Sequence, residues 1–542
     1  MRKNEELTLT CERLGAELEG VCRAENQVVF VPGLLPGETA RVRIVKVEKR
    51  YAFGRLMALE GEPSPERRAP DCPAYPRCGG CTGRHMSYAA TLAAKRQQVE
   101  DCLRRIGGVG EIEVPPVLGM AEPGAYRNKT ALPAGGTADS PQLGFFAPRS
   151  HALIPIERCP NALPPADAIG QAFRRWMREH HVEPYREESG AGLIRHLVVR
   201  VNRRGEALVC VVAAKEKLPA EEALAELLRR AGAVTAVVNH NPRRTNVILG
   251  RDSRVLFGPG VLEDELCGLR FEVSAGAFFQ VNPVQTEVLY RTALDFAGLR
   301  PEDTVCDVYC GAGTITLNMA RHCAGAVGTE VVPQAIENAR ANAVRNGIRN
   351  AEFVCGAAED ELPRMVAAGL RPDVIVVDPP RKGLEEAVIR AIDAAAPRRL
   401  VYVSCNVATQ SRDIALLRTL GWHLDQVQPV DMFCWTSGVE TVVQLSKGEI
   451  SSKPVRVEFS LEGLDTSCLL NDATYQQIKA YVLEHTGLHV STLYIAQVKA
   501  KHGIIERECY NKAKSEGGRV PKCPPEKEKA IEEALRHFQM IP

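Results

Sequence analysis

The spacing of apolar and polar positions changes several times along the chain and first predicts a small barrel. Between residues 7 and 60, short alternating runs such as QVVFV, ARVRIVKV and AFGRLMAL are separated by turns that contain glycine and proline. A period of two with frequent turns is typical of a small all-β barrel of the OB-like kind. We therefore expect an all-β barrel over residues 1–61.

The next pattern mixes strands with a helix. The runs HLVVRVN, ALVCVVAA and AVTAVVNHN are almost entirely apolar, whereas LPAEEALAELLRRAG repeats its apolar positions at helical spacing. This combination predicts a central α+β domain over residues 62–275. Its first fifteen positions are rich in proline and charge, which is typical of a linker.

From about residue 283 the pattern becomes a regular alternation of helices with buried strands. The strands are TVCDVYC, GAVGTEV, DVIVVDPP and LVYVSCN, and each apolar run ends in polar residues. Such runs are required by a mostly parallel sheet that is covered on both faces by helices, and ligands bind such sheets at the carboxyl ends of the strands. We expect a Rossmann-like α/β domain over residues 276–448.

The tail has its own pattern. Strands are predicted at VRVEFSL and TLYIAQV, and helices at TYQQIKAYVLEH and EKEKAIEEALRHF. Residues 449–542 are therefore predicted to form a small α/β extension, whose role the sequence does not reveal.

Composition adds few constraints. The 542 residues contain 68 Lys and Arg against 67 Asp and Glu, so a nucleic-acid site must be a local patch. In residues 41–55, the cations Arg41, Arg43, Lys46, Lys49 and Arg50 are interleaved with Tyr51 and Phe53, which fits either RNA contact or a solvated strand edge. Neither an apolar leader nor an 18-residue apolar stretch is present, so we expect a cytoplasmic protein without a membrane partner.

The 18 cysteines include one close group. In a reducing compartment, close cysteine spacing indicates a metal site or catalysis rather than disulfides. Cys72, Cys78 and Cys81 have C-x5-C-x2-C spacing, and a fourth ligand would come from elsewhere in the chain. Zinc and an iron-sulfur cluster both accept four thiolates, so the spacing leaves the metal open.

A cofactor site is predicted at the ends of two strands. In DVYCGAGTITLNMA, Gly311 and Gly313 allow close approach of a ligand to the backbone and to a helix N-terminus. The motif lacks the full dinucleotide fingerprint, and Glu330 ends the next strand, where its carboxylate can bind ribose hydroxyls or cap a helix. The pair favours S-adenosylmethionine.

Two further strand ends carry candidate chemistry. Asp378 is followed by two prolines, which either stiffen a structural loop or hold the backbone rigid beside a flipped base. Cys405 ends the run VYVSC and precedes a helix start. It is either a small buried hydrophobe or a nucleophile, whose thiol pKa we expect the helix N-terminus to lower.

Taken together, these residues resemble the RNA uracil-5-methyltransferases, specifically the iron-sulfur branch that methylates 23S ribosomal RNA. The resemblance covers roughly residues 7–447 and follows the family's order throughout. The motifs that carry it are FVPGLLPGE, CPAYPRCGGC, FFQVNP, DVYCGAGT, DPPRKG, VSCN and DMFCWTSGVETV.

The resemblance implies a TRAM barrel, a central domain with an iron-sulfur site, a methyltransferase domain and specific residue roles. Cys405 would attack C6 of uracil, and Glu440, otherwise a strand-edge charge, would remove the C5 proton. S-adenosylmethionine would contact Gln280, Tyr309 and Glu330, and Asp378 would lie where cofactor and uracil meet. A [4Fe-4S] cluster would be bound by Cys72, Cys78, Cys81 and Cys159, with Cys102 as a local competitor for the fourth place. No obligate protein partner is implied.

Three positions depart from the family pattern. Cys434 and Gly438 stand where proline and histidine are usual, and Ala357 stands where an acidic residue is frequent. These departures put in doubt the positioning around Glu440 and the binding of the adenine ring. A transfer RNA substrate, a DNA cytosine-5-methyltransferase, an adenine N6-methylase and a non-catalytic RNA-binding assembly factor are the alternatives.

Overall fold

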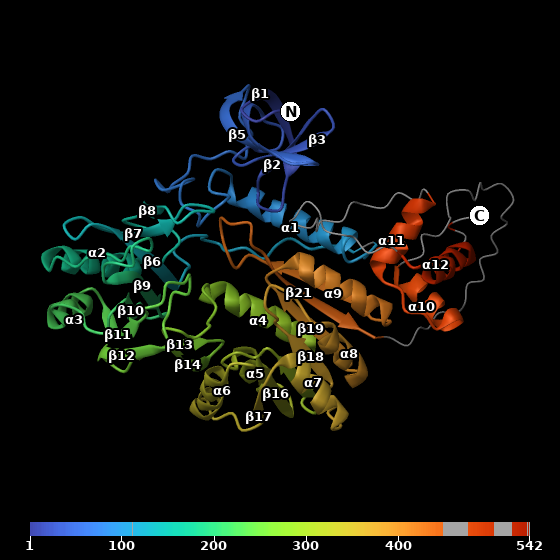
Figure 1. Cartoon of the computed structure of the whole chain (residues 1–542). Helices are drawn as coiled ribbons and strands as arrows, with labels where there is room; N and C mark the ends of the chain where they lie inside the picture. The colour runs from blue at the N-terminus through green and yellow to red at the C-terminus, as the bar shows by residue number, and fades with distance from the viewer. Residues whose placement is uncertain (111, 448–474, 503–522, 539, 541–542) are drawn as a thin grey trace. The chain divides into compact units, whose positions relative to one another are not determined.

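The computed structural model describes residues 1–110, 112–447, 475–502, 523–538 and 540. The chain divides into two compact units, Met1–Ile450 and Ser451–Pro542. Within the first unit, Figure 1 shows a barrel, a central sheet domain and a parallel-sheet domain that follow one another along the chain. None of the helices in these residues is both long and apolar enough to pass through a lipid bilayer.

The predicted barrel is confirmed. Its strands close in the order β1-β2-β3-β5-β4. Alternate side chains of β3 and β4, among them Val29, Val31, Val42 and Ile44, are completely buried inside it, which explains the period of two in the sequence. The strands are β1 (Glu6–Leu14), β2 (Gly20–Ala24), β3 (Gln27–Val31), β4 (Thr39–Val47) and β5 (Tyr51–Glu60).

The central domain is a seven-stranded mixed sheet in the order β12-β11-β10-β9-β6-β7-β8. Helices α2 and α3 contribute to the core on one face, and the hairpin β13–β14 contributes to the core on the other. Strands β9 and β10 are therefore buried at every position, which explains their continuous apolar runs. The elements are β6 (Lys129–Gly136), β7 (Pro141–Phe146), β8 (Leu153–Pro155), α2 (Pro164–Glu179), β9 (Ile194–Val201), β10 (Ala207–Ala213), α3 (Glu221–Arg230), β11 (Ala233–His240), β12 (Asp252–Phe257), β13 (Val261–Leu266) and β14 (Leu269–Ser274).

The third domain contains the predicted parallel sheet, in the order β17-β16-β15-β18-β19-β21-β20. The first five strands are parallel, whereas β21 runs antiparallel to both of its neighbours, β19 and β20. The sequence did not predict the pair β20–β21. The elements are α4 (Pro283–Ala297), β15 (Thr304–Val308), α5 (Thr314–Ala320), β16 (Gly325–Glu330), α6 (Pro333–Arg345), β17 (Ala351–Cys355), α7 (Ala358–Ala367), β18 (Val374–Val377), α8 (Glu386–Ala395), β19 (Arg399–Ser404), α9 (Val407–Thr419), β20 (His423–Val430) and β21 (Glu440–Ser446).

The regular elements among the described residues of the second unit are helices. The helices α10 (Tyr475–Thr486), α11 (Thr492–Lys501) and α12 (Pro525–His537) share a core of their own. The predicted strand TLYIAQV is wrong, because it lies in α11, where Ile495 and Val498 are buried at helical spacing and Ser491 accepts the Tyr494 N–H. The other predicted strand, at residues 455–461, lies outside the described residues.

A buried ion pair connects helix α1 (Tyr88–Arg105) to residues 431–439, the loop that precedes β21. Lys95 and Asp431 form this pair, and both side chains are fully buried. The Tyr88 hydroxyl donates to the Asp431 carboxylate at 2.6 Å, and the Lys95 ammonium also donates to the Phe433 carbonyl at 3.1 Å. Because buried charges are costly unless they are paired and hydrogen-bonded, this network fixes the loop against α1.

We predict that Lys95→Met destabilises the protein by about 3–5 kcal/mol, because it leaves the Asp431 carboxylate buried without its counter-ion. The double variant Lys95→Met/Asp431→Leu should recover most of this loss, since an apolar pair can replace a buried ion pair. Thermal unfolding of the full chain measures both. Arg230→Ala, which breaks the exposed pair with Glu226, is the matched control and should change little. A single variant as stable as the wild type would contradict the proposed role of the pair.

Candidate active site

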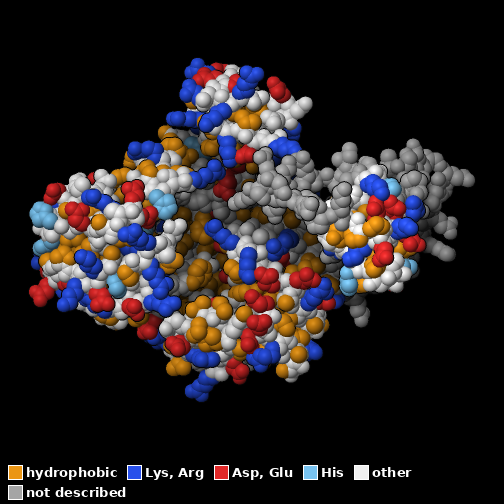
Figure 2. Space-filling view, in the orientation of Figure 1, with side chains coloured by type: hydrophobic (Ala, Val, Ile, Leu, Met, Phe, Trp, Pro, Cys, Tyr) orange, Lys and Arg blue, Asp and Glu red, His pale blue; other side chains and the backbone are white. Residues whose placement is uncertain are grey.

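One cavity of about 990 Å³ lies at the carboxyl ends of the parallel strands. It brings together all the catalytic and cofactor-binding residues expected from the sequence, although they come from separate segments of the chain. Figure 2 shows the face of the first unit hollowed between the central and parallel-sheet domains, with Lys and Arg side chains around the hollow. The six expected residues that line the cavity are Gln280, Tyr309, Glu330, Asp378, Cys405 and Glu440.

The turn after β15 exposes backbone to this cavity. Tyr309, Gly311 and Gly313 all have positive φ angles, of 73°, 55° and 81°. A Cβ added at Gly311 would meet no atom within 4 Å, whereas one at Gly313 would lie 3.1 Å from Ala339 and the Phe353 ring. Gly311 therefore leaves room for a ligand, and Gly313 permits close packing of the turn against its neighbours.

Glu330 ends β16 on the same wall. Its carboxylate accepts the Gly311 N–H at 3.2 Å and the Val332 N–H at 2.9 Å. Since Val332 is the N-cap residue of α6, the carboxylate also supports the start of that helix. This is the helix-capping role that the sequence offered as the alternative to ribose binding. Each carboxylate oxygen can accept a further hydrogen bond, so Glu330 can serve both purposes. Ala357 lines the cavity as well, and Glu359, which the sequence analysis did not single out, supplies a carboxylate two residues later.

The loop that follows Asp378 is tied to the segment after Cys405. The Arg381 carbonyl accepts hydrogen bonds from the Asn406 amide at 3.1 Å and from the Thr409 hydroxyl at 3.2 Å. Asn406 is also the N-cap of α9, whose first N–H groups donate to its side chain. The loops that follow Asp378 and Cys405 are therefore held in one arrangement at the carboxyl ends of the parallel strands.

The environment of Cys405 raises the pKa of its thiol. Burial is the main cause, the Glu440 and Asp378 carboxylates add to it, and the Arg381 guanidinium acts in the opposite direction. Together these groups raise the thiol pKa, and the lowering contribution expected from the helix N-terminus stays a prediction. Arg381 was not identified from the sequence, although it belongs to the motif DPPRKG that singled out Asp378.

Two carboxyl groups of the cavity, the buried Glu440 and the half-buried Asp378, have strongly raised pKa values. Burial raises the pKa of Glu440 to about 8, and the neighbouring Asp378 contributes while Arg381 opposes the shift. Burial likewise raises the pKa of Asp378 to about 7, with a contribution from Asp307. Groups that titrate near neutral pH can accept and return protons during a reaction.

The expected metal ligands lie near one another. Burial raises the pKa of the Cys78 thiol, and the Cys81, Cys159 and Cys72 thiolates raise it further. Cys102 lies instead in α1, against the core of the parallel-sheet domain. In the part of the chain that the structure describes, no three His, Cys, Asp or Glu side chains converge closely enough to hold a single metal ion.

The loop before Glu440 contains two of the positions that depart from the family pattern. The Cys434 side chain is fully buried, with its Sγ 3.5 Å from the Tyr88 hydroxyl. A Cβ at Gly438 would lie 3.3 Å from the Phe433 ring, so a larger residue there would require a small shift. The loop remains attached at both departures, because Trp435 between them accepts the Thr82 and Gly83 N–H groups at 2.9 Å.

Comparisons with known proteins agree with this geometry. The family model described as tRNA (Uracil-5-)-methyltransferase matches residues 247–448, and the TRAM domain model matches residues 2–57. A solved structure of similar fold is the Pyrococcus abyssi tRNA (uracil-54, C5)-methyltransferase in complex with S-adenosyl-L-homocysteine. It has 24% sequence identity and a TM-score of 0.66 and covers 81% of this chain and 100% of that chain.

Curated relatives match over most of their length. An uncharacterized RNA methyltransferase of Clostridium acetobutylicum is 39% identical over 452 residues, which are 82% of this chain and 98% of the relative. One of Halalkalibacterium halodurans is 42% identical over 448 residues, with the same coverage. The chain therefore belongs to the RNA (uracil-5-)-methyltransferase family, whose TRAM barrel it also carries, and it is an enzyme of that class.

Proposed function

We propose that the enzyme methylates C5 of a specific uridine in 23S ribosomal RNA, with S-adenosylmethionine as methyl donor and a covalent bond between Cys405 and uracil C6. The observation that carries the proposal is the single cavity in which a thiol, two carboxyl groups of raised pKa and a glycine turn face one another. The ribosomal substrate is supported by the order of the family motifs and by residues 72–83, which we call the cysteine segment.

The residues present suit S-adenosylmethionine. Gly311 leaves open space at the start of α5, and Glu330 is held by two backbone N–H groups with further acceptor capacity. Glu330 would bind the ribose hydroxyls, and Tyr309 and Gln280 would contact the rest of the molecule from neighbouring walls. When bound, this cofactor supplies an electrophilic methyl group.

Cys405 would begin the reaction by adding its thiolate to C6 of the uracil. This addition turns C5 into an enolate carbon, which takes the methyl group. Arg381, the cation that opposes the rise in the thiol pKa, would stabilise the thiolate. Asp378 would hold the base, which must leave the RNA stack to enter the cavity, at a cost of a few kcal/mol.

Glu440 would complete the reaction. Its carboxylate would accept the proton from C5, after which the bond between Cys405 and C6 breaks and the thiolate is restored. A base with a pKa of about 8 is well matched to this step near neutral pH. Glu440 is the first residue of β21 and directly follows the loop that Lys95 and Asp431 fix. This attachment keeps its side chain on the cavity wall.

We predict that Cys405→Ala abolishes methyl transfer and Glu440→Gln accumulates a covalent enzyme–RNA adduct. Without the thiol no addition occurs, and without the carboxylate the methylated adduct loses its C5 proton slowly, by a factor of about 10²–10⁴. Radiolabelled methyl transfer and retarded RNA on denaturing gels measure the two effects, with unmodified 23S ribosomal RNA as substrate.

Cys355→Ala is the matched control for the thiol, because Cys355 is an exposed cysteine of the same domain that does not line the cavity. It should retain activity. Transfer by Cys405→Ala at the wild-type rate would refute the covalent mechanism, as would the failure of 5-fluorouridine RNA to trap an adduct with active enzyme.

The raised pKa of Glu440 also predicts a dependence of stability on pH. The unfolded carboxyl ionises near its ordinary pKa of 4.5 but the folded one only near 8, so the folded state loses stability as pH rises between these values. Glu440→Gln removes this loss and should be increasingly more stable than the wild type from pH 5 to pH 8. The difference between their melting temperatures measures it. A difference that stays constant across this pH range would contradict the assignment.

We further propose that Cys72, Cys78, Cys81 and Cys159 bind a [4Fe-4S] cluster. Two of the sulfurs already accept hydrogen bonds, from the Gly80 N–H to Cys78 at 3.4 Å and from the Asn161 amide to Cys81 at 3.3 Å. The Cys81, Cys159 and Cys72 thiolates are close enough to raise the pKa of Cys78, which suits four thiolates at one centre, and the resemblance favours a cluster over zinc. Such a cluster would cross-link the cysteine segment to the central domain.

Protein purified without oxygen should be brown and contain iron and sulfide. Cys159→Ser should lower the iron content, whereas Cys102→Ser should not, because Cys102 lies apart from the group. Metal and sulfide analysis provides the measurement. Colourless protein with one zinc ion per chain would refute the cluster.

Transfer RNA is the second candidate substrate, since the archaeal enzyme of similar fold acts on uracil 54 of tRNA. Parallel methylation assays with unmodified 23S ribosomal RNA and unmodified tRNA separate the two candidates. Mapping of 5-methyluridine in a deletion strain then identifies the position.

A further inference from the structure

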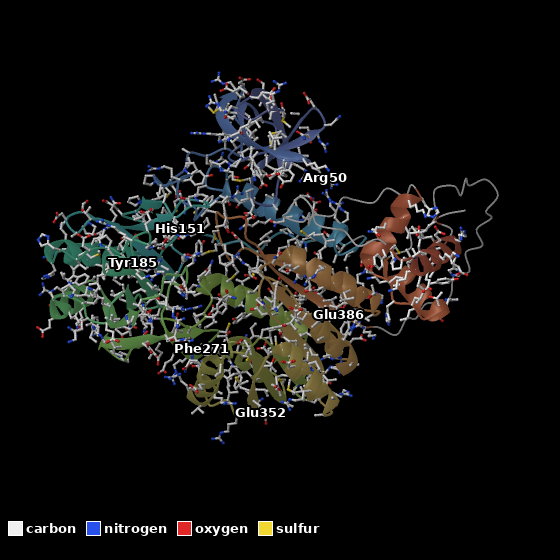
Figure 3. The ribbon with its side chains drawn as sticks, in the orientation of Figure 1. Arg50, His151, Tyr185, Phe271, Glu352 and Glu386 are labelled. Atoms are coloured by element: carbon white, nitrogen blue, oxygen red, sulfur yellow. The ribbon has the colours of Figure 1, made fainter. Side chains whose placement is uncertain are left out.

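A second hollow lies apart from the active-site cavity and has no role in the reaction described above. It has a volume of about 570 Å³ and is formed by two adjacent glycines of the cysteine segment and by residues 145–151, which are the end of β7 and the turn that leads to β8. None of its residues lines the active-site cavity. Figure 3 labels His151 on this turn.

The two walls of the hollow are joined by a close backbone contact. The Gly79 N–H donates to the Phe146 carbonyl at 3.3 Å, and a Cβ at position 79 would lie 3.2 Å from the same oxygen. Glycine therefore allows the cysteine segment to approach the turn this closely. Gly80, which has no side chain to fill the space, forms the adjoining part of the wall.

The other wall combines aromatic rings with a cation. The Phe146 and His151 rings are 5.2 Å apart, and the Arg149 guanidinium lies 5.6 Å from the centre of the Phe53 ring of the barrel. Arg149 has a φ of 57°, a conformation uncommon for residues other than glycine. Phe53 in turn packs against Tyr51 at 5.6 Å, so the ring surface continues from the hollow onto the barrel.

Charge pairing on the barrel separates the cations into two groups. Arg41 and Arg43 both pair with Glu6, and Lys46 pairs with Glu48, which agrees with the solvated-edge interpretation of that part of the segment. Lys49, Arg50 and Arg149 have no acidic partner among the described residues. Among the cations that remain for phosphate, Lys49 and Arg50 directly precede Tyr51, and Arg149 lies at the hollow. Figure 3 labels Arg50.

We propose that this hollow is a second nucleotide-binding site for the substrate RNA, in which one unstacked base of a single-stranded segment packs against Phe146 while Arg149 binds its phosphate. The Phe146 ring is half-buried, and accessible rings next to unpaired cations are the chemistry with which proteins hold single-stranded RNA. The proposal rests on the proposed function for the identity of the RNA. It adds a nucleotide other than the target uridine and places it beside the cysteine segment.

Arg149→Ala in the full-length protein tests the proposal, with unmodified 23S ribosomal RNA transcript as the probe. The dissociation constant should rise about tenfold, and the slope of log affinity against log salt should fall by about one, because one phosphate contact is lost. The effect should appear in the KM for RNA rather than in kcat. Arg230→Ala, at an exposed arginine of α3 paired with Glu226, is the matched control and should change neither quantity.

Arg149→Lys distinguishes the ring contact from charge alone: it should keep the salt slope and lose part of the affinity. RNA containing 4-thiouridine should cross-link to the peptide that contains residues 145–151. Wild-type affinity and slope in Arg149→Ala, or cross-links confined to the barrel and the active site, would overturn the proposal. A wild-type enzyme that binds the RNA but transfers no methyl group would refute the proposed function instead, and the binding measurements would still decide the role of the hollow.

Discussion

The buried ion pair between Lys95 and Asp431 is the constraint on which the arrangement of the site depends. It fixes residues 431–439, and Glu440 follows directly on the cavity wall. The same loop contacts the barrel, where the Ser437 hydroxyl donates to Glu17 at 2.8 Å, and the cysteine segment, whose N–H groups at positions 82 and 83 donate to the Trp435 carbonyl. Helix α1, the barrel and the cysteine segment therefore all contact this loop, although they lie far from it in the sequence. The loop in turn positions the proposed base.

The cavity concentrates groups whose burial opposes stability. The Asp378 carboxylate raises the pKa of Glu440, and both carboxylates raise the pKa of the Cys405 thiol. An apolar wall would be more stable, but it could not move protons near neutral pH. Arg381 is the one cation among the groups that shift the pKa values of Cys405 and Glu440. Its positive charge therefore lowers the free-energy cost of a negative charge on either side chain.

The sequence predicted the regular elements best where burial alone determines the pattern. Alternation in the barrel and apolar runs in β9, β10, β15 and β18 correspond to strands that are buried as expected. The pair β20–β21 escaped prediction, and TLYIAQV was wrongly expected to be a strand. In α11, β-branched and aromatic residues are accommodated because Ile495 and Val498 face the core of a helical unit, a tertiary effect that propensity does not contain.

By itself the sequence determined which chemical groups are available and in which local setting: a thiol and carboxyl groups at strand ends, glycines in a turn, and three closely spaced cysteines. These are properties of short segments, and short-range sterics and periodicity fix them. Tertiary structure alone decided that Arg381 lies beside Cys405 and that burial raises the pKa of that thiol. Burial and the distance between charges depend on contacts between residues far apart in the chain, so no local pattern contains them.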